Sequence, residues 1–481
     1  MMFKKLFRIK SIDSEMAEAG QLKRVLGPIN LIVLGIGAIV GAGIFATVGT
    51  AAAGDAARLG AGPGVILSFL LTAVACGFAA LCYAEFASMV PISGSAYTYS
   101  YTTLGELIAW IIGWDLIIEY AVGNVAVAIS WSGYFCELMR GLGINIPIWL
   151  ATDLRTALHT PEILAQAPHL FGMPIVCNVP AAAIVLAITV VLVIGIRESA
   201  WFNAIMVGIK LLTLAFFVLV GAYYIKPENW HPFAPNGWAG IRAGAAIVFF
   251  AYIGFDAVST AAEETINPKR NMPIGIIGSL VICTIIYIIV AVVVTGIVPS
   301  SQLNVAEPLT VAFNSIGLNR AAGVVAFGSV IAHTAVLLVF QLGQPRIFFS
   351  MARDGLLPPF CARVHKRFRT PHVTTIITGL VVAGFSAFAS IDEMVDLTNI
   401  GTLFAFILIC IGIIVLRFRD PERERPFRCP WVPWIPILGV ISCTYLTLGL
   451  PKITWFRFGA WLVIGMVFYF SYGYWKSKCR G

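Results

Sequence analysis

The segment NLIVLGIGAIVGAGIF, Asn30 to Phe45, has the apolar composition of a membrane span but is interrupted by repeated glycines. A second stretch, GAAIVFFAYIGFDAVSTAAEE from Gly244 to Glu264, has the same character. Glycine destabilises a helix interior by roughly 1 kcal/mol relative to alanine, and each backbone group left unpaired in hydrocarbon costs several kcal/mol. Such breaks persist only where they line a polar cavity, so a matching pair of them indicates the binding site of a membrane transporter.

The whole chain has the composition of a membrane protein. Of its 481 residues, 59% are hydrophobic and 12% are charged, whereas soluble domains carry about 25% charged residues. The net charge of +8 follows from Lys and Arg in alternate loops, the positive-inside pattern, and not from a nucleic acid partner. The ten cysteines are scattered, mostly in apolar runs, where they act as small buried residues. Cys136 and Cys177 flank a predicted external loop and are a candidate pair.

The hydrophobic pattern predicts an all-α membrane protein with twelve transmembrane helices. The predicted spans lie at about 28–50, 63–90, 105–139, 178–196, 200–225, 240–262, 273–298, 320–350, 372–389, 395–417, 432–450 and 454–474. The richest basic segments, Ser350 to His372 and Leu416 to Pro430, fall on the side of the N-terminus. We therefore expect a multi-pass protein of the plasma (inner) membrane with both termini in the cytoplasm.

The two interrupted spans stand first in two groups of five, which predicts an inverted 5+5 repeat with broken helices 1 and 6 plus two additional helices. An odd number of helices in each half inserts the second half upside down, which is the arrangement of alternating-access transporters. The expected divisions are a cytoplasmic N-terminal segment 1–27, repeats 28–225 and 240–417, helices 11 and 12 at 432–474, and a cytoplasmic tail 475–481.

The first break, GAGIF from Gly41 to Phe45, is suited to hold a carboxylate. Little side chain at Gly41, Ala42 and Gly43 lets the backbone unwind, and a helix fragment that starts after a break presents N–H groups and its positive dipole end. The alternative is that these glycines only permit close helix packing. The matching break in span 6 favours binding.

The second break is predicted near Ile253 and Gly254. Carbonyl groups freed from Phe250, Ala251 and Ile253 would accept hydrogen bonds from an ammonium group. Donors for a carboxylate and acceptors for an amine together match an α-amino acid. Phe250 is also a candidate aromatic lid over the substrate, with ordinary core or lipid packing as the alternative.

Lys210 stands near the middle of span 5, where a lone ammonium costs at least about 2.5–3.5 kcal/mol. Asn203, Lys210 and Thr213 share one helical face through spacings of seven and three. One hypothesis is that Lys210 is a permanent cation that holds the broken backbone of span 1 through its carbonyls. The other is that Lys210 gains and loses a proton during transport. A surface lysine reaching for the interface is the third reading, which its central position disfavours.

Glu119 in span 3 begins a stripe of small and polar residues at helical spacing, which predicts an inward face; the stripe is Glu119, Gly123, Ala126, Ser130 and Gly133. A buried carboxylate at a substrate cavity would favour a second positive charge on the ligand, as in lysine, arginine or ornithine. The alternative is a structural ion pair, for example with Lys210. Asp256 and His333 are minor candidates, as a gate or as hydrogen-bonded packing residues.

The chain lacks the sequence patterns of a P-loop, a serine hydrolase elbow, a zinc helix or a Cys/His cluster. We therefore expect neither an enzyme nor an ATP-driven pump, and no cofactor or metal. An ion gradient or substrate exchange remains as the energy source.

The chain resembles the amino acid–polyamine–organocation transporters, and within them the cationic amino acid transporter group, over nearly its whole length. The segments that carry the resemblance are GIGAIVGAGIF, FFAYIGFDAVSTAAEETINPKRNMPIGI, LGQPRIFFSMARDGLLPPF and RPFRCPWVPWIPILG. The resemblance implies substrate contacts at Ile39, Ala42, Gly43, Phe250 and Ile253. It also implies that Lys210 occupies the place of a sodium ion, which supports proton coupling, and that Glu119 is the acidic residue of the cationic group. Many relatives carry Ser or Thr where this chain has Ala42, so one hydroxyl contact to the carboxylate is missing.

These observations predict a proton-coupled importer of amino acids, with cationic ones preferred. The substrate-binding candidates are Ile39, Gly41, Ala42, Gly43, Glu119, Phe250, Ala251 and Ile253, and the proton-coupling candidate is Lys210. The alternatives are a broad or neutral amino acid carrier, an exchanger, and a non-transporting amino acid sensor. Expected partners are the amino acid, protons and the lipid bilayer; the sequence leaves open a small membrane subunit.

Overall fold

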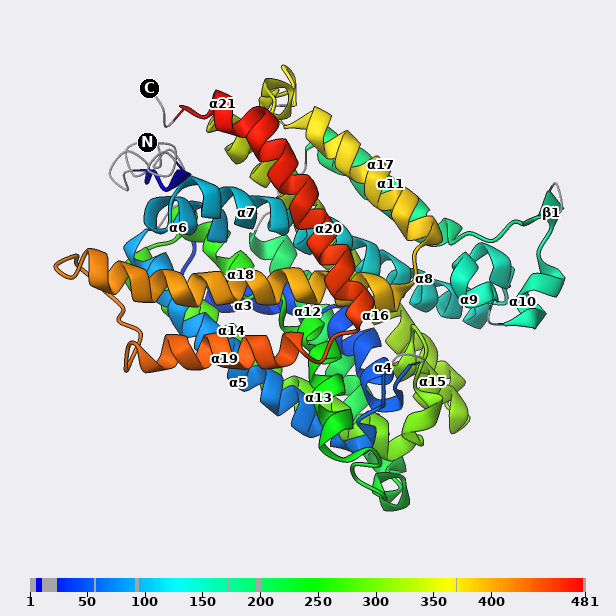
Figure 1. Ribbon diagram of the computed structural model, residues 1–481. Helices are drawn as coiled ribbons and strands as arrows, with labels where there is room; N and C mark the ends of the chain where they lie inside the picture. Colours follow the sequence, from blue (N-terminus) through cyan, green and yellow to red (C-terminus); the bar gives the residue numbers. More distant parts are fainter. Residues whose placement is uncertain are drawn as a thin grey trace.

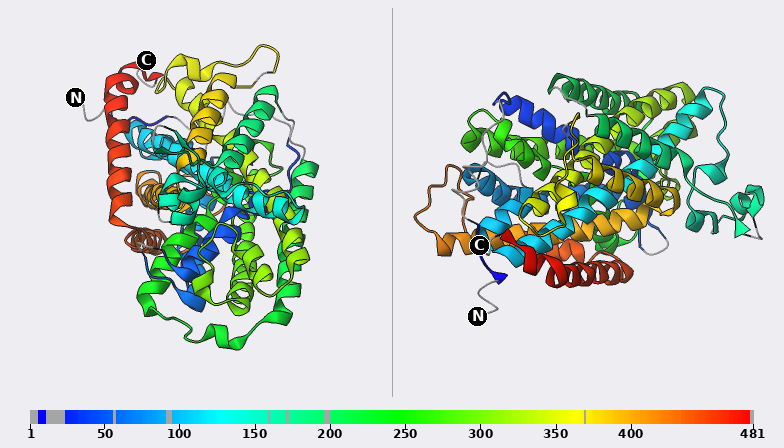
Figure 2. Two further views of the ribbon diagram at one scale, coloured as in Figure 1. Left: turned by 90° about the vertical axis from the view of Figure 1, so that its right-hand side faces the viewer. Right: turned by 90° about the horizontal axis from the view of Figure 1, so that it is seen from above.

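The computed structural model describes residues 6–10, 24–55, 58–90, 95–158, 160–170, 173–195, 200–368 and 370–478. The described chain is a bundle of helices (Figures 1 and 2). One short antiparallel hairpin, β1 (His169–Leu170) with β2 (Met173–Pro174), interrupts the predicted all-α architecture. It lies at the tip of a loop that projects from the bundle (Figure 1). Parts of the expected N-terminal segment, 1–5 and 11–23, and residues 479–481 of the expected tail lie outside the described residues.

Eight helices of the described chain are long and apolar enough to cross a membrane. They are Gly62–Met89, Glu106–Gly141, Trp201–Tyr224, Gly237–Glu264, Pro268–Ile297, Asn319–Arg353, Ile391–Arg419 and Lys452–Lys476. A bent pair, Pro28–Ile39 with Gly43–Ala53, makes a ninth span if its two parts are counted together. Three shorter apolar helices are α11 (Val179–Ile194), α17 (His372–Phe388) and α19 (Trp434–Thr447). The membrane class is confirmed, and the exact number of twelve spans stays a prediction because these three helices are short.

The first predicted break is present. Helix α3 (Pro28–Ile39) ends at Val40, whose backbone turns extended. A π-helical turn, η1 (Gly43–Thr47), then leads into α4 (Val48–Ala53). The two parts of the span are bent by 46°. The unwinding coincides with the glycines of the sequence, because a chain with little side chain there loses little packing by leaving the helix.

The second predicted break is present as well. Helix α13 (Gly237–Val248) tightens into a 3-10 turn, η7 (Phe249–Tyr252), and the chain then leaves helical geometry at Ile253 and Gly254. Gly254 has a φ of 115°, a region that a residue with a Cβ rarely adopts. A second 3-10 segment, η8 (Asp256–Glu264), continues the span.

The two breaks lie against each other. A Cβ atom on Gly43 would lie 2.2 Å from the Cα atom of Ala251, and one on Gly254 would lie 2.9 Å from the carbonyl carbon of Ala38. Each chain therefore occupies the space that a side chain on the other would need. Glycine is required at Gly43 and Gly254 by close contact with neighbouring backbone.

Helices that occupy equivalent places in the two expected halves pack on each other. Helix α5 (Val65–Met89) packs on α14 (Pro268–Ile297), α8 (Gly123–Gly141) on α16 (Asn319–Arg353), and α11 on α17. Figure 1 shows α11 and α17 side by side at the flank of the bundle. Two halves related by a two-fold axis would produce this pairing. The residue boundaries of the repeats remain a prediction.

The first and last described segments, residues 6–10 and 474–478, lie at one end of the bundle, which we call the terminus end (Figure 1). There Asp354 accepts a hydrogen bond from the Lys10 ammonium at 3.0 Å, and its carbonyl accepts one from the Lys478 amide at 3.0 Å. We call the opposite end the cavity end.

A short backbone ladder joins the two broken spans at the terminus end. The amides of Val25 and Leu26 donate to the Glu264 carbonyl at 2.8 and 3.0 Å, and the amide of Ile266 donates to the Leu26 carbonyl at 2.9 Å. The segment just before α3 is thereby tied to the end of η8 through main-chain hydrogen bonds.

Replacing Gly43 with alanine should destabilise the protein, because the added methyl group would overlap backbone atoms of Ala251. Overpacking a core typically costs about 1–3 kcal/mol, and we expect a clear fall in the midpoint of thermal unfolding in detergent. The control is Gly77→Ala in α5, where an added Cβ would meet no atom within 4 Å. Its expected midpoint is unchanged or higher. Equal midpoints for Gly43→Ala and the unmodified protein would contradict the close contact of the two breaks.

Candidate substrate site

Lys210 holds the first break together from the side. It lies on α12 (Ala200–Gly221) and is completely buried. Its ammonium donates to the carbonyl of Gly37 at 2.8 Å and to that of Val40 at 3.0 Å. The last carbonyls of a helix have no partner within the helix and form its negative end. The cation therefore satisfies groups that the break would otherwise leave unpaired in the protein interior.

A second side chain completes the same turn. The hydroxyl of Tyr287, on α14, donates to the Ile39 carbonyl at 3.0 Å. On the other broken span, the side-chain amide of Asn399 donates to the carbonyls of Ala246 and Ile247 at 2.7 and 3.2 Å. Neighbouring helices thus replace the hydrogen bonds that unwinding removes, which is the condition for irregular backbone at membrane depth.

The predicted substrate-binding residues at the breaks come together and are all buried; they are Ile39, Gly41, Ala42, Gly43, Phe250, Ala251 and Ile253. The Gly41 carbonyl accepts from the amides of Ile44 and Phe45, so the helical fragment begins at this glycine and directs its positive end at the break. Only 5% of Phe250 is exposed. The structure therefore shows the break region closed from both ends.

Glu119 lies in a π-helical turn, η3 (Ile118–Val122), within the third span, and is 2% exposed. The carboxyl groups of Asp256, on the second broken span, and of Asp115 act on it electrostatically, and the Thr402 side chain also lies close to it. Lys210 is bound to carbonyl groups instead, so the ion pair considered between Glu119 and Lys210 is not formed in the described chain. Sequence reasoning named Glu119 and Asp256 separately, and the fold brings the two carboxyl groups together.

His333 is a buried link between two helices. Its Nε2 atom lies 2.8 Å from the Ser130 hydroxyl of α8, and its Nδ1 atom lies 2.7 Å from the Ser329 carbonyl of its own helix. The ring also packs on Phe45 and Tyr134. Both ring nitrogens thus have hydrogen-bonding partners within the helix bundle.

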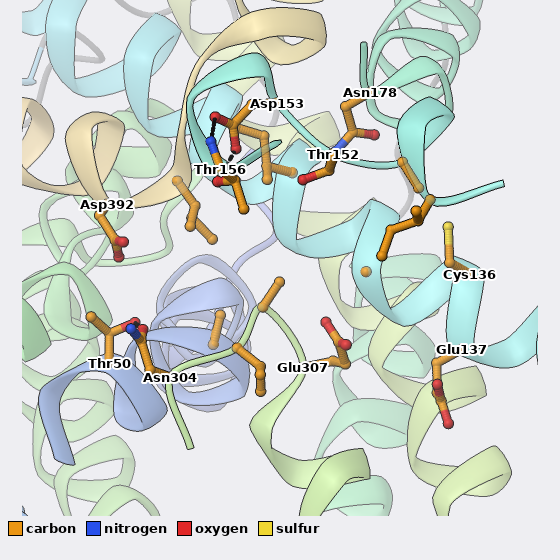
Figure 3. A pocket seen from close by; sticks show the side chains of 18 of the residues that line it. Thr50, Cys136, Glu137, Thr152, Asp153, Thr156, Asn178, Asn304, Glu307 and Asp392 are labelled. Carbon is orange, nitrogen blue, oxygen red and sulfur yellow. Dashed lines mark hydrogen bonds between the residues drawn. The ribbon is translucent and has the colours of Figure 1, made fainter. Parts of the chain in front are cut away.

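A cavity of about 630 Å³ lies at the cavity end, above the breaks (Figure 3). Its walls come from α4, from α8, from the loop 145–178 and from residues 304–307. Helix α18 (Ile391–Arg419) closes the remaining side with its first turns. Ala46, Thr47 and Ile247 line its floor one or two turns from the breaks, and none of the predicted substrate-binding residues lines it. This cavity, which we call the antechamber, therefore lies beside the closed break region and not between the two breaks.

An ion pair fastens the wall of this cavity. Arg58, in the loop after α4, pairs with Asp55 and, at 2.5 Å, with Asp396 of α18. The side chains of Arg58 and Asp396 are only 6% and 7% exposed. Sequence reasoning missed this contact, although Arg58 was visible as a basic residue on the less basic side of the membrane.

The described chain contains no group of three His, Cys, Asp or Glu side chains that could hold a metal ion. Cys136 and Cys177, the candidate disulfide, are free thiols. Two interrupted spans in contact, with breaks satisfied by side chains of neighbouring helices and a polar cavity beside them, define a membrane transporter built around broken helices. Sequence comparison agrees: residues 26–469 match the amino acid permease family model, and the chain belongs to that family.

Three relatives show the range of this family. The chain is 47% identical over 477 residues, 98% of each protein, to the branched-chain amino acid permease BcaP of Bacillus subtilis. It is 44% identical over 469 residues, 97% of each protein, to the methylthioribose transporter of the same organism. It is 38% identical over 411 residues, 84% of this chain and 64% of the relative, to the vacuolar cationic amino acid transporter 4 of Arabidopsis thaliana. The relatives are transporters and not enzymes, and this chain is an amino acid permease of the membrane.

Replacing Arg58 with glutamine should loosen the cavity wall. Removing one partner of a buried ion pair typically costs about 3–5 kcal/mol because the other charge stays buried. Cys136 lines the cavity and is a free thiol, so its reaction with a membrane-impermeant thiol reagent measures access. In a Cys177→Ser background, we expect Arg58→Gln to speed this reaction several-fold.

The matched control for this experiment is Arg155→Gln. Arg155 lies at the same end of the molecule and pairs with Glu393, but its side chain is 61% exposed, and such surface pairs contribute about 0–1 kcal/mol. Its Cys136 rate should match that of the parent. An unchanged rate in a folded Arg58→Gln protein would remove the proposed role of the ion pair in closing the wall.

Proposed function

We propose that the protein imports α-amino acids together with protons, with Lys210 as the coupling group. The observation that carries this proposal is the pair of hydrogen bonds from the Lys210 ammonium to the Gly37 and Val40 carbonyls. A protonated lysine holds the last turn before the break. A neutral amine attracts the same carbonyls more weakly, so the proton on Lys210 and the shape of the break depend on each other.

The substrate would span the two breaks. Its carboxylate would meet the positive end of the helical fragment at Gly41, Ala42 and Gly43. Its ammonium would meet the carbonyls of the second break, those of Phe250, Ala251 and Ile253 in the inferred arrangement. The contact between Gly43 and Ala251 supports this proposal, because the two sets of groups lie within the length of one amino acid backbone.

Orientation in the membrane follows from charge. The basic segments Ser350 to His372 and Leu416 to Pro430 flank helices that end at the terminus end. By the positive-inside pattern that end faces the cytoplasm, and the cavity then opens to the outside of the plasma (inner) membrane. Substrate would enter through the cavity, pass its floor at Thr47 and Ile247, and reach the breaks.

Cationic side chains are the preferred substrates in this proposal. The adjacent carboxyl groups of Glu119 and Asp256 are buried in the third and sixth spans. An arginine or lysine side chain reaching towards them would supply the positive charge that this pair lacks. Phe250 supports the placement, because its ring lies 4.0 Å from where a Cβ on Gly123 would stand, one helical turn from Glu119.

Branched-chain amino acids are the second candidate. One similar protein carries that substrate class in its name. The walls near the first break also include the apolar side chains of Ile39 and Val336, with a Val336 methyl group 2.8 Å from where a Cβ on Gly41 would stand. Competition by a panel of unlabelled amino acids against labelled arginine and labelled leucine in proteoliposomes separates the two candidates.

Lys210→Ala should abolish uptake driven by an imposed pH gradient. The substitution leaves the Gly37 and Val40 carbonyls unpaired, at about 1–3 kcal/mol for each buried group, and it removes the titrating amine. Uptake into liposomes with and without a pH gradient measures the effect. Lys452→Ala, at the exposed start of α20 (Lys452–Phe468), is the control and should behave as the unmodified protein. Retained pH dependence in Lys210→Ala would exclude Lys210 as the coupling group.

Glu119→Gln should lose arginine and lysine transport before it loses alanine transport. The amide keeps the size of the side chain and removes its negative charge, so a cationic substrate loses about tenfold or more in kcat/KM, equivalent to about 1.4 kcal/mol. The measurement is the ratio of kcat/KM for arginine to that for alanine. An unchanged ratio, with both substrates transported, would favour the branched-chain candidate or a purely structural role of Glu119.

A further inference from the structure

The side chain of Glu307 sits in the cavity and is not used by the mechanism described above. Glu307 stands just before α15 (Pro308–Ser315), and its carboxylate points into the open space of the cavity (Figure 3). It rests on Gly133 of α8: a Cβ on that glycine would lie 2.6 Å from the Glu307 Oε2 atom. The missing side chain of Gly133 on α8 thus leaves space for the carboxylate of Glu307, which comes from the opposite side of the cavity.

All but one of the other charged residues that line the cavity are already engaged, and the exception is Asp392. Glu137 of α8 pairs with Arg140 and accepts a hydrogen bond from the Asn314 amide at 2.6 Å. Arg58 is paired with Asp55 and Asp396. Asp153 of the covering loop accepts hydrogen bonds from Thr156, and Asp392 faces the cavity from the first turn of α18.

Glu307 itself makes no hydrogen bond or ion pair through its carboxylate with any described residue. Enclosure by the protein and the nearby Glu137 together raise the pKa of this carboxyl group to about 7, against the opposing effect of Arg140. The carboxylate is therefore an uncompensated negative charge above pH 7 and a neutral acid below it.

We propose that Glu307 is a first binding station for the ammonium group of the substrate, in the antechamber and ahead of the breaks. The proposal rests on the proposed function, because it takes the cavity to be the entrance for amino acids. A metal ion is disfavoured, since the described chain has no cluster of three metal-binding side chains. A volume of about 630 Å³ accommodates an amino acid, and the pair Thr50 and Asn304, joined at 3.3 Å, offers polar groups for the rest of the molecule.

Acid is expected to affect Glu307 and Lys210 in opposite ways, so the role of Glu307 in capture can be separated from the role of Lys210 in proton coupling. Protonation of Glu307 at external pH below about 7 removes the charge that attracts the ammonium group, so capture weakens in acid. Protonation of Lys210, in contrast, accompanies transport. Measurements with equal pH on both sides of the membrane isolate the first effect.

The charge of the antechamber can be measured directly at Cys136. In the Cys177→Ser background, the rate of modification by a cationic methanethiosulfonate is compared with that by an anionic one. One carboxylate at close range should change this rate ratio by about three- to tenfold. We expect the ratio to rise between pH 6 and pH 8, and to stay low and flat in Glu307→Gln.

The use of the station by substrate is tested by exchange of labelled arginine, and of labelled leucine, across proteoliposomes at equal internal and external pH. Apparent KM should fall several-fold from pH 6 to pH 8 in the parent and in Glu307→Asp. It should stay high in Glu307→Gln, with kcat little changed. Glu162→Gln is the matched control, because Glu162 is an exposed carboxylate of the loop 145–178 that covers the cavity but does not itself line it.

Two results would contradict the proposed role of Glu307. One is a ratio of cationic to anionic reagent rates at Cys136 that is the same in Glu307→Gln and in the parent. The other is a pH dependence of KM that Glu307→Gln leaves unaltered. Both require a protein that exchanges amino acids. Absence of exchange by the parent for every amino acid tested would instead refute the proposed function. The two failures are therefore distinguishable.

Discussion

The buried ammonium group of Lys210 stabilises a broken helix in the interior of a membrane protein. Unwinding at Val40 leaves carbonyl groups that water would normally solvate, and water is scarce at this depth. Lys210 supplies the missing donors from a neighbouring helix, and Tyr287 supplies one more. The glycines permit the break, but these side chains make it stable. The close contact of Gly43 with Ala251 depends in turn on the break being held in place.

The structure places a wide cavity beside a closed break region. The antechamber is polar, charged and wide, whereas the break region below it is closed and lined by backbone. The floor at Thr47 and Ile247 is the narrow partition between them. Arg58 ties the loop after the first broken span to α18 across the cavity wall. A rearrangement that opens this floor would therefore involve the first broken span and α18, which the Arg58–Asp396 ion pair connects.

Much of the central architecture can be predicted from the sequence, because each of its features is a residue type that is unfavourable inside an apolar helix. Glycines inside apolar runs mark both breaks, and a lone charge inside an apolar run marks Lys210. The sequence does not predict which residues far apart in the chain contact each other. Arg58 and Asp396 are 338 positions apart, and nothing local pairs them.

The same limit applies to residues that break no local rule. Tyr287 is unremarkable in an apolar helix until its hydroxyl is seen against the Ile39 carbonyl. The small hairpin at His169 carries no strand pattern long enough to detect. The exclusion of the predicted substrate residues from the cavity depends on how tightly the two breaks close, which only the packed structure determines.

At the terminus end, the ladder between Val25, Leu26 and the end of the second broken span consists of peptide groups. Amide hydrogen exchange at Val25, Leu26 and Ile266 therefore reports how often the two broken spans separate at the terminus end.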